Sequence, residues 1–401
     1  MNNKSIDVTI VGGGIVGLGI GVALLRKKPT IRVVVLESES KLAEHGSGRN
    51  SGVLHAGFYY SPDSLKAQLT RRGNEMLRKL CYDEGIPLRE CGKVVVTRNV
   101  EEIQRLNDLH SHAIANGVDV RMINSRELFE IEPLAKTNEV ALWSPNTAVA
   151  NPTEVTEMMA RVFTRMGGEI RFNHKANSIN GTIVVLESQE KISSGHVVNA
   201  AGLHADKLAH TVGVGTKYTI LPFKGLYLYG NDQAPTLSRH VYPVPDPRNP
   251  FLGVHLTVTS NGYTKIGPTA IPALSRHNYS KFGGIRLGEL LPIAATLPKF
   301  LTSKHHDGLG LVKSEFPKYL RKALVKKATE LVPTVRVDQF THWGKSGIRA
   351  QLFNLLEKKL EMDFVVEIAE NQTHVLNAVS PAWTSSLSFG EHVADQVLSR
   401  L

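Results

Sequence analysis

The feature that most restricts the fold is a glycine pattern directly after a short apolar run. IDVTIV at residues 6–11 has the composition of a buried strand, and VGGGIVG then places Gly12, Gly14 and Gly17 at G-x-G-x-x-G spacing. In a β-α-β unit the first glycine permits a tight turn, the second lets the backbone approach a pyrophosphate, and the third lets helix and strand pack closely. The pattern therefore predicts a dinucleotide-binding fold.

An acidic residue after the next strand agrees with this prediction. We expect a helix from Gly12 to Lys28 and a second strand from Arg32 to Leu36, with Glu37 directly after it. Glu37 follows the last glycine of the pattern by about 20 residues, where a carboxylate accepts hydrogen bonds from the adenosine ribose. A carboxylate there also argues against a 2′-phosphate. A glycine-rich turn without a ligand is the alternative.

Three further segments favour a flavin over a nicotinamide. SGRNSGVLHAG, VVNAAGLHAD and NAVSPAWTSSLSFGEHVAD occupy residues 47–57, 197–206 and 377–395. A tightly held flavin calls for close backbone segments from distant parts of the chain, whereas a nicotinamide is usually held loosely by one such fold. Small residues in the last segment precede a helix, whose N-terminal amides and dipole suit an electron-rich flavin edge.

Length and pattern predict two domains. A chain of 401 residues exceeds the roughly 250 to 300 residues at which one core stops growing. Residues 218–270 alternate apolar and polar positions, which is typical of an antiparallel sheet. We expect a discontinuous, Rossmann-like α/β FAD-binding domain of residues 1–90, 150–217 and 345–401, and an inserted antiparallel-sheet substrate domain of residues 91–149 and 218–344.

The remaining elements follow from periodicity and turn residues. Helices are expected at residues 63–85, 99–116, 152–167, 282–300, 314–331 and 384–399. Strands are expected at residues 92–97, 118–123, 169–172, 183–186, 196–199 and 364–368, the last of these being the final strand of the chain.

The net charge of +10 predicts an acidic partner, which is nucleic acid, an anionic membrane surface or a small anion. No nucleic-acid-binding motif is present, so we expect no nucleic-acid partner. The densest basic stretch, Lys299 to Lys327, is interleaved with Leu, Phe and Tyr. It is either a solvated helical face or a peripheral contact with anionic lipid. No apolar run is long enough to span a bilayer.

Cysteine and histidine usage gives little support to a metal site. Cys81 and Cys91 are the two cysteines, they lack metal-ligand spacing, and no HExxH motif accompanies the 16 histidines. Few cysteines fit a reducing compartment. We expect a cytoplasmic protein, with contact to the inner face of a membrane as a further hypothesis. The C-terminal Ser399, Arg400 and Leu401 also resemble a peroxisomal address.

Longer motifs carry a family resemblance. These motifs are Gly12 to Gly17, SGRNSGVLHAGFYYSPDSLKA, CGKVVV, YPVPDPRNPFLGVHLT, IGPTAI, SGIRAQ and HVLNAVSPAWTSS. They resemble the L-2-hydroxyglutarate dehydrogenase/oxidase family of the glycine-oxidase and D-amino-acid-oxidase-like FAD enzymes, and the match runs from residue 6 to about residue 395. The resemblance implies FAD, oxidation of L-2-hydroxyglutarate to 2-oxoglutarate, and electron delivery to a quinone or another acceptor, commonly with peripheral membrane association. An amine or amino-acid oxidase of the same fold is the alternative, and YPVPDPR with GVH favours the hydroxy-acid branch.

The chain departs from the family pattern at four positions. Lys224 stands where the family usually has arginine, and Leu226 where it has an acidic residue. Val379 replaces a proline and Trp383 a small residue. Lysine keeps the charge but loses the bidentate grip on a carboxylate, so these positions bear on which 2-hydroxy acid is bound.

Patterns and resemblance together predict the site residues. Hydride transfer from an alcohol carbon needs a base, for which we favour His255, with His55 beside the flavin ring; the alternative for each is a structural histidine. Arg349 is expected to hold a substrate carboxylate, or else to form a surface ion pair, and Lys224, Lys66 and Tyr60 follow as substrate contacts. The predicted cofactor-binding residues are Gly12, Gly14, Gly17, Glu37, Ser47, Arg49, Asn50, Ser51, Gly52, Ala201, Gly202, Gly347, Ser380, Pro381, Thr384 and Ser385.

Overall fold

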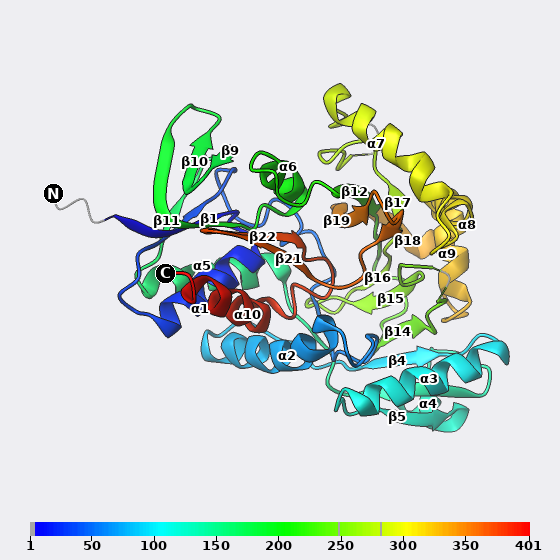
Figure 1. The fold of residues 1–401 in the computed structure, drawn as a ribbon. Coiled ribbons are helices and arrows are strands. Elements are labelled where there is room, and N and C mark those ends of the chain that lie inside the picture. Colours follow the sequence, from blue (N-terminus) through cyan, green and yellow to red (C-terminus); the bar gives the residue numbers. More distant parts are fainter. Residues whose placement is uncertain (1–4, 248, 281–282) are drawn as a thin grey trace.

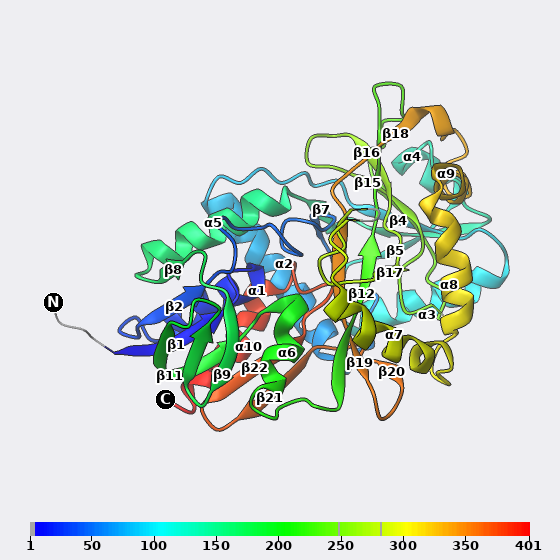
Figure 2. The same cartoon turned by 90° about the horizontal axis from the view of Figure 1, so that it is seen from above.

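The computed structural model describes residues 5–247, 249–280 and 283–401. Figure 1 shows the chain as two large sheets with their own helices, and Figure 2 shows the same arrangement from above. β1 and the C-terminus lie on the same side of the molecule (Figure 1).

The first sheet contains the predicted glycine-pattern unit. Its strand order is β21-β22-β11-β1-β2-β8, with β10 and β9 added beside β11. β1 pairs in parallel with both β2 and β11, and β21 is an antiparallel edge strand. The strands are β1 (Ile6–Val11), β2 (Val33–Leu36), β8 (Glu169–Arg171), β9 (Ala176–Asn180), β10 (Ile183–Leu186), β11 (Lys191–Asn199), β21 (Val365–Ala369) and β22 (Gln372–Asn377).

Alternating side chains bury both faces of this sheet. Val8 and Ile10 pack into one core, whereas Val11 packs into another on the opposite face. The first core is closed by helices α1 (Ile15–Lys27), α2 (Leu65–Asp83), α5 (Pro152–Arg165) and α10 (Ser386–Leu398). The second is closed by the β9–β10 hairpin and by α6 (Ala205–His210), which follows a short 3₁₀ turn at Gly202–His204.

The second sheet is largely antiparallel and has the order β18-β13-β16-β15-β14-β4-β6-β5. Parallel pairing of β14 with β4 joins its two chain segments. The strands are β4 (Lys93–Val96), β5 (Arg121–Asn124), β6 (Val140–Ser144), β13 (Leu228–Gly230), β14 (His240–Pro243), β15 (His255–Val258), β16 (Thr264–Gly267) and β18 (Phe340–Trp343).

Alternation in β4 again assigns the two faces. Val94 and Val96 pack with α9 (Arg321–Thr329), and Val95 packs with α3 (Glu101–Ala115). Helix α4 (Ser125–Ile131) begins directly after β5 with a capping box at Asn124.

A smaller sheet of order β17-β12-β19-β20 connects the two halves. Its strands are β12 (Tyr218–Gly225), β17 (Ile271–Pro272), β19 (Gly347–Asn354) and β20 (Lys359–Leu360), and a separate short pair is formed by β3 (Val53–Leu54) and β7 (Ala148–Val149). β19 pairs with β12 along its whole length, so strands from both predicted domains meet in this sheet. The domain boundaries themselves stay a prediction.

The outer helices differ in part from expectation. The predicted helix at 314–331 is wrong, because α8 (Gly308–Glu315) ends there, a 3₁₀ turn follows at Phe316–Tyr319, and α9 then begins. Pro317 lacks an N–H and stands in the first turn of the 3₁₀ segment. The helical backbone is interrupted at Leu320, which is extended with φ of −88° and ψ of 123°. The predicted helix at 282–300 is α7 (Leu287–Leu301), and residue 282 lies outside the described residues.

The buried strands β19 and β22 were among those not expected from the sequence. The strand at 364–368 is not the last one, because β22 follows it, and the eight residues of β19 were not predicted. Across the described ranges no helix is both long and apolar enough to cross a membrane.

Candidate active site

A cavity of about 460 Å³ is lined by segments of both sheets. The first sheet contributes the β1–α1 turn and the loops after β2, β11 and β22. The other two sheets contribute His255, Tyr242, Tyr227 and Arg349.

The β1–α1 turn requires glycine at two positions. Gly12 has φ of +113°, and a Cβ on it would lie 2.4 Å from the Ala200 carbonyl oxygen. A Cβ on Gly17 would lie 2.1 Å from the Gly12 carbonyl oxygen. The bare backbone at Gly12 and Gly14 lines the cavity at the N-terminal end of α1, which is the geometry that cradles a pyrophosphate.

Glu37 is held against this turn. Its Oε2 accepts the Gly13 N–H at 3.0 Å, and its Oε1 accepts the Glu39 N–H at 2.9 Å and the Ser38 hydroxyl at 3.1 Å. The carboxylate is buried and lines the cavity. Since each carboxylate oxygen offers about two acceptor positions, capacity remains for ribose hydroxyls.

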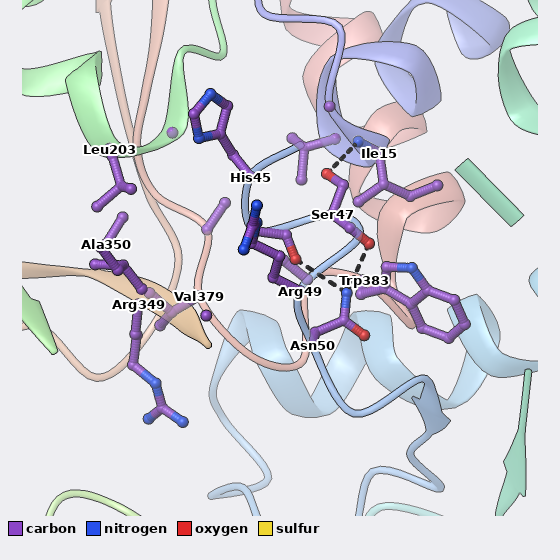
Figure 3. A pocket seen from close by; sticks show the side chains of 18 of the residues that line it. Ile15, His45, Ser47, Arg49, Asn50, Leu203, Arg349, Ala350, Val379 and Trp383 are labelled. Atoms are coloured by element: carbon purple, nitrogen blue, oxygen red, sulfur yellow. Dashed lines mark hydrogen bonds between the residues drawn. The ribbon is translucent and has the colours of Figure 1, made fainter. Parts of the chain in front are cut away.

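The Ser47–Gly52 segment is shaped by its own side chains. Ser47 Oγ accepts the Ile15 N–H at 2.9 Å at the start of α1 (Figure 3). Asn50 Nδ2 donates to the Gly46 and Ser47 carbonyls at 3.0 and 2.8 Å, and Asn50 Oδ1 accepts the Gly52 N–H at 2.8 Å. The contacts found for Ser47 and Asn50 hold the loop, and their predicted contacts to the cofactor stay a prediction.

Arg49 also uses its donors within the protein. Its Nε donates to the Glu44 carbonyl, and its guanidinium lies 4.5 Å from the centre of the Tyr279 ring. His45 links the same region, with Nδ1 2.8 Å from the Tyr279 hydroxyl and Nε2 3.0 Å from Glu39 Oε1. Arg49 and His45 therefore fasten the loop after β2 to the segment after β17.

The structure gathers most of the predicted cofactor-binding residues around the cavity. Those that line it are Gly12, Gly14, Glu37, Ser47, Arg49, Asn50, Ser51, Ala201, Gly202, Gly347, Ser380, Pro381 and Thr384. Gly17, Gly52 and Ser385 are outside the lining. Gly17 and Gly52 allow close backbone packing, since a Cβ on Gly52 would lie 2.2 Å from the Ala150 carbonyl oxygen. Ser385 Oγ donates to the Pro381 carbonyl at 3.1 Å.

His255 lies in the cavity with one ring nitrogen bound to the backbone. The first residue of β15, it lines the cavity and its ring stacks on Tyr242 with centroids 3.7 Å apart. Its Nδ1 lies 2.8 Å from the Gly253 carbonyl oxygen. Because a carbonyl only accepts, Nδ1 carries the proton and Nε2 carries the lone pair of the neutral ring. Burial, with the charges of Lys93, Lys265 and Arg349, lowers the pKa of His255 to about 3.

His55 lines the same cavity, but no hydrogen bond in the described residues fixes its ring. Its backbone N–H donates to Thr384 Oγ1 at 3.1 Å, and its carbonyl accepts from Asn74 Nδ2 at 3.1 Å. Its buried Nδ1 has no hydrogen-bond partner in the described part of the chain. Burial, and then the Lys93 charge, hold the pKa of His55 well below its usual value.

Arg349 projects from β19 into the cavity (Figure 3). Its guanidinium lies 4.7 Å from the centre of the Phe251 ring. Within residues 5–247, 249–280 and 283–401, no hydrogen bond or ion pair engages it. The alternative of a surface ion pair therefore does not describe Arg349, and its fork is free to bind a carboxylate.

The other three predicted substrate contacts are not part of the lining. Lys224 Nζ donates instead to Asn278 Oδ1 at 2.7 Å and to the Ser280 carbonyl at 2.8 Å. Burial lowers the pKa of Lys66 to about 7 and raises the pKa of Tyr60, and the Arg349 charge lowers the pKa of both.

Sequence reasoning missed two lysines and two tyrosines. Lys265 of β16 is buried, donates to the Ser51 carbonyl at 3.0 Å and lies 4.8 Å from the Tyr227 ring centre. Lys93 of β4 is fully buried near Tyr242. The available signal was a lysine inside an otherwise apolar strand, in GKVVV and in TKIG. Among the described residues no group of His, Cys, Asp and Glu could hold a metal ion.

Comparisons with known proteins identify the class. The family described as "DAO: FAD dependent oxidoreductase" matches residues 7–396. The solved FAD-bound, dithionite-reduced L-α-glycerophosphate oxidase from Mycoplasma pneumoniae superimposes with a TM-score of 0.78 at 20% identity, covering 99% of this chain and 95% of that one. The protein is thus an FAD-dependent oxidoreductase, which confirms the predicted fold class and cofactor.

Two relatives define the family more narrowly. The mitochondrial L-2-hydroxyglutarate dehydrogenase of Caenorhabditis briggsae is 35% identical over 410 residues, covering 98% of this chain and 93% of that protein. The L-2-hydroxyglutarate dehydrogenase of Indibacter alkaliphilus is 36% identical over 405 residues, covering 98% and 99%. The chain belongs to the L-2-hydroxyglutarate dehydrogenase family, as its motifs indicated.

The residues present fit FAD. The Gly12 turn leaves backbone open where a side chain would block a pyrophosphate, and Glu37 keeps acceptor capacity beside it. Residues Ala378 to Thr384 line the same cavity before α10, so the N-terminal end of that helix lies close to the flavin region. FAD bound there would supply the hydride acceptor in the same cavity that His255 and Arg349 line.

Proposed function

We propose that this protein oxidises the hydroxyl-bearing carbon of L-2-hydroxyglutarate to give 2-oxoglutarate. The observation that carries the proposal is the guanidinium of Arg349, which has no partner among the described residues and lies in the same cavity as His255. His255 Nε2 likewise has no partner in that part of the chain, since Nδ1 is the ring nitrogen that contacts a carbonyl. When bound, FAD supplies the two-electron acceptor for the hydride from the alcohol carbon. The named relatives support the choice of substrate.

The electrostatics favour a doubly negative substrate. The charges of Lys93, Lys265 and Arg349 lower the pKa of His255, and all three groups are cations. A dicarboxylate neutralises part of this charge, so its binding raises the pKa of His255 toward a value suited to a base. Nε2 of His255 then accepts the hydroxyl proton while Arg349 orients one carboxylate.

The test is an anaerobic absorbance spectrum of the purified protein before and after L-2-hydroxyglutarate is added. Bleaching of the flavin bands is the expected result. Flavin bands that persist would reject the substrate and direct attention to Lys224, Leu226 and Trp383. Bleaching by amines or amino acids instead would favour the amine-oxidase alternative.

Arg349→Lys is expected to raise the apparent Kd for L-2-hydroxyglutarate about 100-fold while FAD stays bound. Lysine keeps the charge but loses one of two parallel hydrogen bonds and the planar stack on Phe251. Spectral titration of the oxidised enzyme gives the Kd. Lys224→Arg is the matched control, because Lys224 donates away from the cavity, and an unchanged Kd in Arg349→Lys would reject its role.

We also propose that electrons pass to a quinone or another acceptor, with peripheral contact to an anionic membrane. Support comes from exposed apolar side chains on α7, α8 and the turn after α8, on the outer side of the molecule (Figure 2). They are Leu287, Leu291, Leu309, Phe316 and Leu320. Exposed Lys299, Lys313, Arg321 and Lys322 accompany them, the combination that suits an anionic interface.

The membrane proposal has its own measurement. Leu287 and Leu291 are one helical turn apart and are 78% and 74% exposed. Changing both to serine is expected to weaken sedimentation with phosphatidylserine vesicles at least tenfold. Leu356→Ser, at a residue 76% exposed outside this surface, should leave it unchanged. If the wild-type protein, the double variant and Leu356→Ser bound vesicles equally, the proposed membrane contact through α7 would be rejected.

For location, we propose the cytoplasm at the inner face of a membrane. The basic and apolar surface of α7 and α8 supports this proposal. The exposed Ser399, Arg400 and Leu401 support a peroxisomal address as the alternative. Fluorescence microscopy of the tagged protein, with and without the last three residues, separates the two.

A further inference from the structure

Lys93 is an unusual charge at the centre of the second sheet. Its side chain is fully buried, and its Nζ has no hydrogen-bond partner in the described ranges. The ammonium faces aromatic rings instead, at 4.4 Å from the centre of Tyr242, 4.9 Å from Tyr59 and 5.2 Å from Phe58. A buried, unpaired lysine costs stability, and three ring faces recover only part of that cost.

Tyr242 connects Lys93 to the proposed base. One ring contacts both groups, since the Tyr242 ring stacks on His255 with an interplanar angle of 18°. Sheet pairing fixes this arrangement, because β14 lies between β4 and β15. Lys93 does not line the cavity, so a substrate reaches His255 while Tyr242 separates it from the ammonium.

We infer that Lys93 is a positioning residue for the oxidation, whose enclosed ammonium on Tyr242 keeps His255 unprotonated as the base. The inference rests on the proposed function, since it assigns His255 that role. As the pH falls, the proton goes to the Lys93 amine, and the resulting charge opposes a second proton on His255. The base therefore stays available in weak acid.

The surrounding groups support this reading. Burial lowers the pKa of Lys93 to about 7, so its amine gains a proton well before His255 does. The titratable and charged groups around the pair are Cys91, His240 and Tyr242 from β4 and β14, His55 and Tyr59 from the segment after β3, Lys265 from β16 and Arg349 from β19. None of them is a carboxylate, so the Lys93 charge acts without a neutralising partner.

The test is Lys93→Met in the holoenzyme, which keeps the length of the stem and removes the charge. Flavin reduction by L-2-hydroxyglutarate is measured at saturating substrate across the pH range in which the enzyme stays folded, from about pH 3 upward. The acid limb of the pH profile is expected to move upward by about one pH unit, which is a tenfold gain in the proton affinity of His255. Lys93→Arg should restore the wild-type limb. Lys318→Met, at another buried lysine that is paired with Glu315, should not move it.

Stability provides a readout that needs no substrate. The folded-state pKa of Lys93 lies below its unfolded value, so the unfolded chain binds more protons between about pH 7 and 10. Lys93 therefore destabilises the folded state most below pH 7, and this penalty fades as the pH rises. Lys93→Met is expected to raise Tm, with the larger gain at pH 6 than at pH 9.

The outcomes separate the possible failures. An unchanged acid limb in Lys93→Met overturns the inference. A large rise in KM with no displacement of the acid limb also overturns it, because this result would mean that Lys93 contacts a substrate carboxylate directly. Wild-type enzyme that is not reduced by L-2-hydroxyglutarate instead rejects the proposed function. A titration of ¹³C-labelled histidines, assigned with His255→Asn, then still tests whether Lys93 acts on His255. If Lys93→Met fails to fold, Lys93→Gln replaces it.

Discussion

His255→Asn is expected to keep FAD bound and to slow flavin reduction by L-2-hydroxyglutarate about 1000-fold. Asparagine retains a donor for the Gly253 carbonyl, which His255 Nδ1 contacts at 2.8 Å, but it has no basic lone pair in place of Nε2. General-base catalysis contributes about 10² to 10⁴ in rate. Anaerobic stopped-flow absorbance at saturating substrate measures the reduction step directly.

His55→Asn is the matched comparison. Both histidines are buried in the cavity and both have a lowered pKa, so a general effect of polarity would appear in both variants. Only His255 has a tautomer fixed by a backbone carbonyl. We expect a smaller decrease for His55→Asn, and the reverse ranking would transfer the role of base to His55.

Local rules predicted the cofactor half of the site well. The glycine pattern, the strand before it and the acidic residue after the next strand all depend on neighbours in the β-α-β unit. The structure therefore places Gly12, Gly14 and Glu37 together at the cavity. It adds one contact that spacing alone does not specify, the Gly13 N–H bound to Glu37.

Buried polar residues limited the prediction elsewhere. β22 reads QTHVLN and looks polar, yet it is buried throughout. His374 Nε2 bonds Gln372 at 2.9 Å, and Asn377 donates to the carbonyls of Glu361 and Asp363 at 2.8 and 2.6 Å. Strand periodicity assumes that polar side chains face water, so a strand whose polar groups find partners inside the protein escapes it.

Charge alone also failed to assign the substrate contacts. The sequence predicted three cationic substrate contacts, Lys224, Lys66 and Arg349. Of these three, Arg349 alone lines the cavity. The side chain of Lys224 is oriented by its hydrogen bonds to Asn278 and Ser280, which lie 54 and 56 residues further along the chain. No short-range pattern contains that information.

Trp383, which stands where the family has a small residue, has two kinds of neighbour. It packs in the core beside α1, α2 and α10 and also lines the cavity, as Figure 3 shows near Asn50. The ring therefore both fills a core gap and narrows the cavity. Its Nε1 has no hydrogen-bond partner in the described part of the chain, so the indole acts there mainly through its shape.

Gly12→Ala is expected to abolish FAD binding, the largest effect of any single change considered for this chain. At a φ of +113° an alanine is strained, and its Cβ would lie 2.4 Å from the Ala200 carbonyl oxygen. Strain of about 1 to 3 kcal/mol follows from the dihedral alone. The Gly12 N–H bond to the Leu36 carbonyl, 2.8 Å in length, must also distort, which displaces the turn that faces the pyrophosphate.

Gly46→Ala provides the control for Gly12→Ala. Gly46 lines the same cavity, but a Cβ on it meets no atom within 4 Å and its φ is outside the left-handed region. The absorbance ratio of flavin to protein and the Tm are measured for both purified variants. We expect a colourless Gly12→Ala protein with a Tm lowered by several degrees and a yellow Gly46→Ala protein close to wild type. Stoichiometric flavin in Gly12→Ala would mean that the turn yields, and that the bare backbone at Gly12 is not what admits the cofactor.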